Sequence, residues 1–330
     1  MAGQFWSPSD EGGYLYSDEL SELIRMQLQP RCKFRQFTEP READKPLHKG
    51  ANFYWDVISS IGTRASSALG EREKMPETDF TITQRSLTVT EGGNSVPFSQ
   101  KLEMLAKHDL VAIIEKTLRE DAMKFFDASV YTQFNLTPLR ATPTSGTSTT
   151  AITLDTTVQA TVTNNIEMGI EHIKLIADTM QERNIPAYMD GDYVCLSRPT
   201  TLRPVKDDLE AIHQYTETGL SMIFAGEKGR YEGIRFVEQT NIPVGGAYDS
   251  TTFDAFTGTG DAWNNAKSSW AFFFGGDTVL ECLVVPEEIR AKIPTDFGRS
   301  KAIAWYYLGG YGLVHTDATN ARIIKWDSAA

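Results

Sequence analysis

The chain has 330 residues, of which 41% are hydrophobic and 23% charged, a composition typical of a globular protein rather than a disordered one. Its 44 acidic and 32 basic side chains give a net charge of −12, which disfavours a protein that coats nucleic acid or binds an anionic membrane surface. No apolar run is long enough to span a membrane and no signal-peptide pattern opens the chain, so we expect a protein kept in the cytoplasm.

The first 50 residues predict an extended polar arm rather than a folded unit. One short helix is expected over 18–28, where apolar residues form a single stripe that Pro30 ends. An arm with so few apolar side chains cannot bury a core of its own, so we expect it to lie on another surface. Residues 53–69 are more apolar and are expected to join a core.

Residues 70–101 predict a long polar hairpin. Near-alternating apolar residues over 81–90 predict one strand, and residues 95–100 predict the strand that returns. Between them, Glu91-Gly92-Gly93-Asn94 predicts the turn. A two-stranded unit of this kind has little to bury and is marginal by itself in water.

Residues 102–134 predict one long helix, because apolar residues recur at helical spacing and neither Gly nor Pro interrupts them. A helix of this length would span roughly 50 Å. The Thr-, Ser- and Pro-rich stretch over 135–160 then predicts a loop or a β-rich connector.

The C-terminal half of the chain predicts short helices and strands in patches. Helices are expected over 164–183 and from Arg203-Pro204 onward, and a Gly-, Thr- and Asp-rich loop over 245–268. Strands are expected at 193–196, 233–238, 269–274, 278–285, 302–314 and 321–326. Because helices and strands do not alternate regularly, the fold class indicated is α+β.

Sequence patterns typical of enzymes are missing. The chain contains no phosphate-binding loop, no dinucleotide-binding glycine pattern, no zinc-protease helix and no nucleophile elbow. Cys195 and Cys282 lie in apolar runs, which predicts buried thiols, and Cys32 is far from both. His172 and His213 stand among solvent-type residues, and we expect both to be exposed. We therefore expect no catalytic residue, cofactor or metal.

The segment over 193–243 carries the most specific pattern. It predicts a strand, a short helix that starts near Pro204, and a second strand with the pattern G-x-R-F-V-E-x-T-N. The residues of that pattern are Gly233, Arg235, Phe236, Val237, Glu238, Thr240 and Asn241. Together with the order of elements, this segment resembles the major capsid proteins of tailed bacteriophages, which have the Hong Kong 97-type shell fold shared with herpesviruses. The subgroup that it resembles is the N4-like one.

The resemblance implies an α+β capsid fold with three parts. Residues 1–50 would be the N-terminal arm, 51–160 with 271–330 the peripheral domain, and 161–270 the axial domain. The peripheral domain would hold its sheet, an extended loop hairpin at about 70–101 and a spine helix at about 102–134. The glycine-rich loop over 245–268 would stand at the tip of the axial domain.

The resemblance also implies a structural virion protein and not an enzyme. Its copies would self-assemble in the host bacterial cytoplasm into hexamers and pentamers of an icosahedral capsid that encloses double-stranded DNA without reading its sequence. Partners would be other copies of the chain, the portal, a separate scaffolding protein and, in some shells, a decoration protein; no membrane is implied.

The contacts between subunits are expected in and around the extended loop. The predicted interface residues are Arg72, Lys74, Arg85, Glu91, Asn94 and Lys101. Two alternatives remain open at this point. Another virion component, such as a decoration or tail protein, would not close into a shell, and an enzyme with an unfamiliar site would have a deep pocket with perturbed titratable groups.

Overall fold

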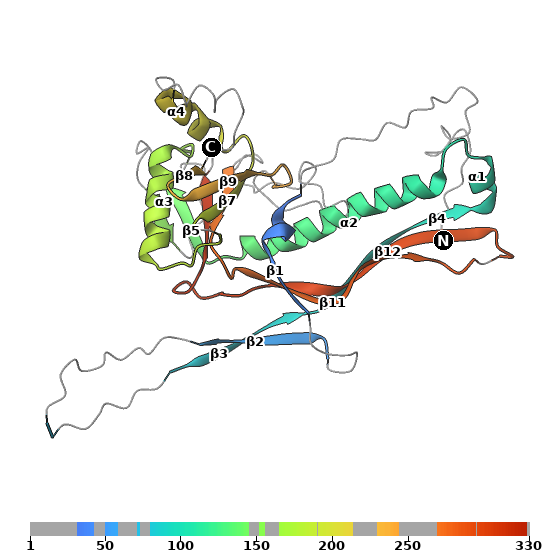
Figure 1. Cartoon of the computed structure of the whole chain (residues 1–330), viewed down its shortest axis with the longest axis horizontal. Coiled ribbons are helices and arrows are strands. Elements are labelled where there is room, and N and C mark those ends of the chain that lie inside the picture. The colour runs from blue at the N-terminus through green and yellow to red at the C-terminus, as the bar shows by residue number, and fades with distance from the viewer. Residues whose placement is uncertain are drawn as a thin grey trace.

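The computed structural model of the chain describes most of its length. The described residues are 32–42, 50–58, 71–72, 80–144, 152–155, 165–189, 191–213, 230–243, 269–294 and 296–328. They form a body made of two mixed sheets and a long helix, and a two-stranded sheet that projects away from this body (Figure 1). The mixture of helices and sheets confirms the predicted α+β class.

A seven-stranded sheet forms one lobe of the body, with the strand order β6-β5-β13-β10-β7-β9-β8. Its strands are β5 (Leu139–Pro143), β6 (Ile152–Asp155), β7 (Tyr193–Ser197), β8 (Arg230–Tyr231), β9 (Ile234–Glu238), β10 (Ser269–Phe274) and β13 (Ile323–Ser328). Helices α3 (Ile170–Glu182) and α4 (Arg203–His213) belong to the same lobe. Because side chains alternate along β10, Phe273 packs in the core that contains α3, whereas Phe272 packs against the long helix α2 (Leu110–Asn135).

A four-stranded sheet with the order β1-β11-β12-β4 lies along α2. Its strands are β1 (Glu39–Glu42), β11 (Val279–Ala291), β12 (Ser300–Leu313) and β4 (Thr90–Ser99). The buried residues of α2 recur every four positions from Leu110 to Phe126, and they pack against Trp305 and Tyr307 of β12. The C-terminal half of α2 continues into the core of the seven-stranded lobe, so one helix joins both halves of the body (Figure 1).

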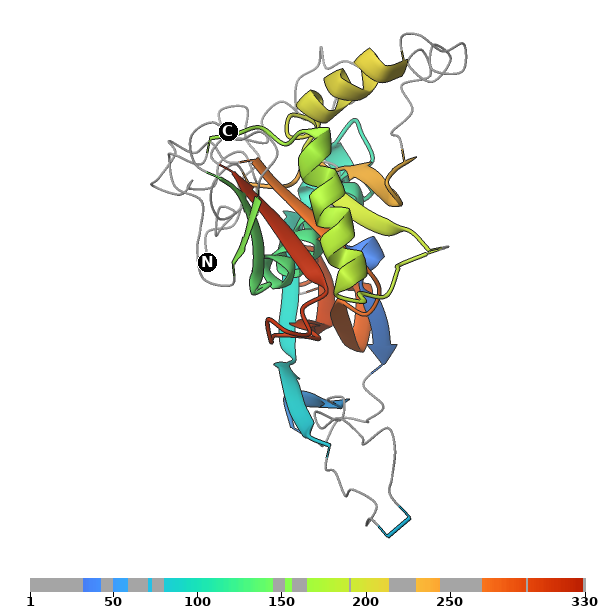
Figure 2. The same cartoon turned by 90° about the vertical axis from the view of Figure 1, so that its left-hand side faces the viewer.

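The projecting sheet consists of β2 (Asn52–Ile58) and β3 (Ile82–Thr88), which pair antiparallel. Both views show it extending away from the two larger sheets (Figures 1 and 2). Along β2, side chains alternate strictly between exposed and half-buried, and none is fully buried. The expectation that 53–69 joins a core is confirmed in part for β2, because Phe53 and Trp55 pack half-buried against a cluster that contains Leu87.

The predicted hairpin over 70–101 is wrong in its pairing. β3 pairs with β2 rather than with the strand that follows it, and β4 runs without a turn through the two glycines while pairing with β12. A Cβ on Gly92 would stand 2.7 Å from the ring of Phe125, and one on Gly93 would stand 2.8 Å from the carbonyl oxygen of Trp305. These glycines therefore allow close packing of the strand and do not form a turn.

The predicted single helix over 102–134 is also wrong, because it is broken in two. Helix α1 (Gln100–Leu105) ends first, and α2 starts after Asp109. Oδ1 of Asp109 accepts hydrogen bonds from the N–H groups of Val111 (3.1 Å) and Ala112 (3.3 Å). An N-cap residue starts a new helix here, although the spacing of apolar residues alone predicts that the first helix continues.

Helix α3 differs from its prediction in its start and in its histidine. It begins at Ile170, several residues later than the predicted range 164–183. His172 is fully buried rather than exposed, so that prediction is wrong. Its Nδ1 accepts a hydrogen bond from the N–H of Gly169 (3.1 Å) and its ring packs on Trp326 (centroids 5.0 Å apart), so the imidazole is part of the interior of the lobe.

The remaining predictions fall into two groups. The four strands expected between 269 and 326 correspond to β10, β11, β12 and β13, and Cys195 and Cys282 are buried as predicted. The helix over 18–28, the loop over 245–268, Lys74 and the side chain of His213 lie outside the described residues.

Candidate functional site: the arm seat and the projecting sheet

The described part of the N-terminal arm, residues 32–42, lies across α2 and the edge of the four-stranded sheet. Phe34 has no exposed surface and packs against Tyr131, Phe134 and Phe272, with ring centroids 5.6, 5.3 and 5.7 Å away. Burying a whole phenyl side chain contributes about 2–3 kcal/mol. The arm is therefore anchored in the core shared by α2 and the seven-stranded sheet.

A buried carboxylate holds the backbone of the arm next to this anchor. Asp127 of α2 is 1% exposed, and its oxygens accept hydrogen bonds from Phe34 N (2.8 Å), Gln239 Nε2 (2.5 Å) and Asn241 Nδ2 (2.9 Å). Gln239 also accepts a hydrogen bond from Lys33 N (3.2 Å) through its Oε1. Burial raises the pKa of Asp127 to about 7, because desolvation outweighs the stabilisation that these donors give to the charge.

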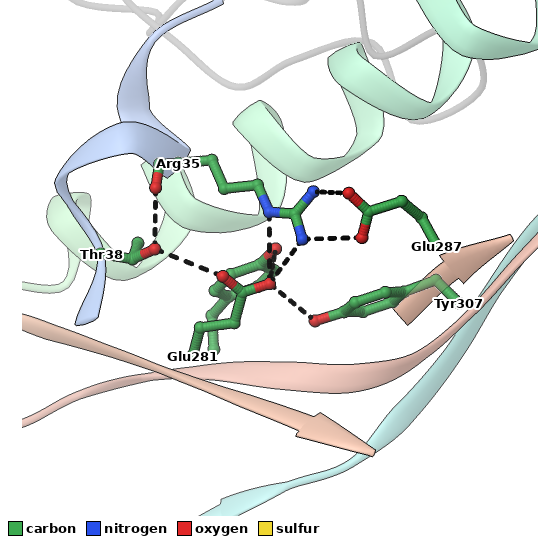
Figure 3. Close-up of polar contacts among 6 residues, drawn as sticks. Arg35, Thr38, Glu281, Glu287 and Tyr307 are labelled. Atoms are coloured by element: carbon green, nitrogen blue, oxygen red, sulfur yellow. Dashed lines mark hydrogen bonds and ion pairs between the residues drawn. The ribbon is translucent and has the colours of Figure 1, made fainter. Parts of the chain in front are cut away.

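An ion-pair cluster holds the arm at its next residue (Figure 3). The guanidinium of Arg35 lies 2.9 Å from Oε1 of Glu281, and its two terminal nitrogens bind the carboxylate of Glu287 at 2.8 and 2.9 Å. The same group stacks over the ring of Phe126, 4.2 Å from its centroid. The hydrogen bonds from Arg35 lower the pKa of Glu287, so the pair with Glu287 stays charged at neutral pH.

Glu281 is the buried carboxylate of this cluster, and it accepts hydrogen bonds from several donors. Tyr307 and Tyr311 both donate to its Oε1, at 3.3 and 3.1 Å, and Thr38 Oγ1 lies 3.5 Å from its Oε2. A buried carboxylate needs such a set of partners, since leaving it unpaired is costly. We call Asp127, Gln239, Asn241, Glu281 and Glu287 the arm seat.

Beyond the arm seat the arm becomes a strand. β1 pairs in parallel with β11, with Glu39 opposite Leu280 and Glu42 opposite Leu283. The N–H of Asp277 donates to Oε1 of Glu39 (3.0 Å) at the start of this pairing. A segment too polar to fold alone is thus ordered by adding to an existing sheet edge.

The root of the projecting sheet is packed on β12. Leu87 is buried together with Leu280, Cys282 and Val314, and a Cβ on Gly312 would stand 3.1 Å from the Cβ of Leu87. Glycine at this position lets the two sheets lie in contact. The root is therefore fixed to the body.

The exposed face of the projecting sheet is mostly polar, and its apolar side chains gather toward its outer end. Tyr54, Ile58, Phe80 and Ile82 are 54%, 66%, 56% and 54% exposed, and Ile58 stands directly opposite Ile82 in the register. Several exposed apolar side chains gathered on one thin element mark a surface that binds a partner.

Of the six interface residues predicted from the sequence, the five that the structure describes are not brought together in one place. Arg72 is exposed, Arg85 is half-buried on β3 opposite Trp55, and Lys101 is exposed on α1. Glu91 and Asn94 are both exposed on β4 but point to opposite faces of the strand, because three positions separate them. Glu91 accepts a hydrogen bond from the hydroxyl of Tyr306 (3.3 Å), and Asn94 donates to Asp121 (3.0 Å).

Sequence reasoning missed the arm seat. One signal was present, since Asp127 follows Phe125 and Phe126 on a helix, and a carboxylate beside an apolar face is unusual. Arg35 and Glu281 carry no local signal, because 246 positions separate them in the sequence.

The described ranges also lack two other kinds of feature. None of the helices there combines the length and apolarity that crossing a membrane requires. In the same part of the chain, no three His, Cys, Asp or Glu side chains are grouped so that they would hold a metal ion.

Comparison with known proteins gives a match in structure only. No protein-family model matches the chain, and no curated protein sequence does. Among solved structures, the capsid of Ralstonia phage GP4 matches with a TM-score of 0.64 and 13% identity over 99% of this chain and 98% of that one. The capsid of cyanophage Pam1 matches with a TM-score of 0.67 and 10% identity over 95% and 97% of the two chains. The corresponding values for cyanophage P-SCSP1u are 0.61, 12%, 94% and 92%. The chain therefore has the fold of tailed-phage capsid proteins over nearly its whole length.

Proposed function

We propose that this chain is the major capsid protein of a tailed phage, a structural subunit whose copies form hexamers and pentamers of an icosahedral virion shell around double-stranded DNA. The observation that carries the proposal is the match to the GP4 capsid chain over 99% of this chain and 98% of that one. The matched length leaves out no sizeable element, so it includes the arm and the projecting sheet, which a compact enzyme would not need.

The projecting sheet supports a clasp between neighbouring copies. A two-stranded sheet is marginal by itself, and a neighbouring subunit is the surface that would cover the exposed apolar side chains at its outer end. Contacts of this kind join different patches on the two copies, so they generate closed rings when the rotation is right. Each contact can be weak, because every subunit makes several of them.

The same proposal keeps the division into arm, peripheral domain and axial domain, with α2 as the spine helix. The separate hydrophobic cores around α3 and along the N-terminal half of α2 support two units. The seven-stranded sheet nevertheless takes β5, β6, β13 and most of β10 from chain outside 161–270, so we place these strands with the axial unit. Arg72 and Arg85 remain our candidates for interface residues.

The finer assignment to the N4-like subgroup rests on the segment over 193–243. In the structure its strand–helix–strand order is β7, α4 and β9, and the two strands pair in parallel. The same segment supplies Gln239 and Asn241 to the arm seat. We also propose the portal, a scaffolding protein and, in some shells, a decoration protein as partners.

The test is assembly. The chain is expressed in bacteria, and the lysate is fractionated by sedimentation and viewed by negative-stain electron microscopy. Closed shells, or rings of five and six copies, are expected. A chain that stays monomeric, both alone and together with the proposed scaffolding protein, would refute the proposal.

A further inference from the structure

Asp127 is the point at which three separate segments meet. It lies on α2, it accepts a hydrogen bond from Phe34 N of the arm, and it accepts two more from Gln239 and Asn241 in the turn after β9. The turn follows β9, which belongs to the seven-stranded sheet, and the arm continues into β1 of the four-stranded sheet. One carboxyl group thus ties the arm to both halves of the body.

We propose that Asp127 is a charge-dependent fastener, which holds residues 32–42 of the arm tightly when it is protonated and less tightly when it is ionised. The donors around it are the backbone N–H groups of Phe34 and Lys33 and two neutral side-chain amides. Neutral donors stabilise a buried carboxylate only in part, and the cost of removing its charge from water remains. When the arm leaves, water reaches the carboxyl group and this cost disappears.

The charged and titratable groups near Asp127 come from all three segments. On the arm, these are the Cys32 thiol, Lys33 and Arg35, and the guanidinium of Arg35 is bound to Glu281 and Glu287. On α2 it is Lys124, and at the end of β9 it is Glu238, which forms an ion pair with Lys206. No ion pair between Asp127 and a cationic side chain is found among the described residues.

The direction of the pH effect follows from the shift. The pKa of Asp127 is raised from 3.8 to about 7 when the arm is seated, so the seated form binds a proton more tightly than the released form. The extra affinity for the arm is complete below pH 3.8 and is lost as the pH rises to about 7. The Arg35–Glu287 pair behaves in the opposite way, because the pKa of Glu287 is lowered. Both anchors therefore hold together in mildly acidic solution.

The inference deepens the proposed function, since release of the arm would decide whether a shell subunit offers residues 32–42 to a neighbouring copy. It is nevertheless a property of the single chain. A chain that never forms shells can still show it, and a shell subunit can lack it, so the two proposals fail separately.

Hydrogen–deuterium exchange of the peptide over 32–38 tests the fastener, with the full-length chain kept dilute. Phe34 N–H reports directly on the bond to Asp127. Protection of this peptide should fall roughly tenfold or more between pH 5 and pH 7.5, after correction for intrinsic exchange. In Asp127→Asn the protection should be independent of pH and close to the wild-type level at pH 5, because the amide is neutral like the protonated carboxyl group. Since the peptide is the same in both proteins, their ratio removes the intrinsic pH dependence.

Two controls keep the outcome decisive. Arg35→Gln should weaken protection at every pH but keep the slope of the wild type, which separates the effect of Asp127 from that of the ion-pair cluster. Amides of α3, which lies in a separate core, should show no such slope and thereby exclude global unfolding. Protection that is flat with pH in the wild type, or that increases as the pH rises, would overturn the proposal.

Discussion

Gly93 of β4 lies against the backbone of Trp305 on β12, so closely that a Cβ in its place would stand 2.8 Å from the carbonyl oxygen. The neighbouring atom is part of a paired strand and cannot move aside as a side chain can. We predict that Gly93→Ala lowers the free energy of unfolding by about 1–3 kcal/mol, measured by denaturant titration. Ser95→Ala, at an exposed position of the same strand, is the control and should change it by less than about 0.5 kcal/mol. A neutral Gly93→Ala would mean that these glycines form the turn that the sequence suggested.

The aromatic anchor of the arm gives a second prediction. Phe34→Ala removes a fully buried ring from between α2 and β10, a change that costs about 3–5 kcal/mol where the cavity cannot close. Because the arm can detach without unfolding the body, we expect faster trypsin cleavage at Lys33 and Arg35. For the same reason, the melting temperature should fall by less than this cost would produce in the body itself. Phe80→Ala, which removes an exposed ring, should leave the cleavage rate unchanged.

The two carboxylates that hold Arg35 should contribute unequally. Arg35→Gln leaves the buried Glu281 without its cation, which costs about 3–5 kcal/mol when no other partner replaces it. Glu287→Gln removes a partner whose side chain is 46% exposed and should cost about 1 kcal/mol or less. Thermal unfolding of both variants beside the wild type measures the difference. Equal effects would show that the exposed pair, rather than the buried one, fixes the arm.

The outer face of the projecting sheet should matter for assembly and not for folding. Ile58→Lys with Ile82→Lys puts two charges on exposed apolar positions, so the circular dichroism spectrum and the melting temperature should be unchanged. Shell formation on expression should be lost, because the apolar end of the sheet that a neighbour would cover then carries two charges. Ser86→Lys with Thr88→Lys adds the same charge to exposed polar positions of the same face and should still assemble. Shells formed by the first variant would exclude this face from the clasp.

Proteolysis gives a prediction about the segment near Arg72, which is exposed in the single chain. Trypsin should cleave the dissociated subunit early at Arg72, and assembled particles should resist cleavage there, because a neighbouring copy lies over the segment. The sites are identified by mass spectrometry of the first fragments. Equal cleavage in subunit and particle would show that the segment is not part of a contact.

The sequence by itself determined the elements whose signals are local. The aromatic run over 269–274 predicted β10 with its observed bounds, and the apolar runs after it predicted the three strands that follow. Such strands can be predicted because a buried strand is apolar along its own length. The resemblance in the segment over 193–243 pointed to the capsid fold, which the solved phage capsids match. These features depend on neighbours within a few positions.

Only the tertiary structure decided what depends on distant neighbours. A Gly-Gly pair predicts a turn or a close approach equally well, and the position of Trp305 decides between the two. β3 pairs with β2 rather than with β4, because only Val89 separates β3 from β4 and the chain does not turn back there. The arm seat joins Arg35 to Glu281 across 246 positions, and a buried ion pair is recognised only once the fold has removed its members from water. Local patterns indicate many of the segments that become helices and strands. Burial and charge pairing depend on the folded chain, and they decide where the arm is held.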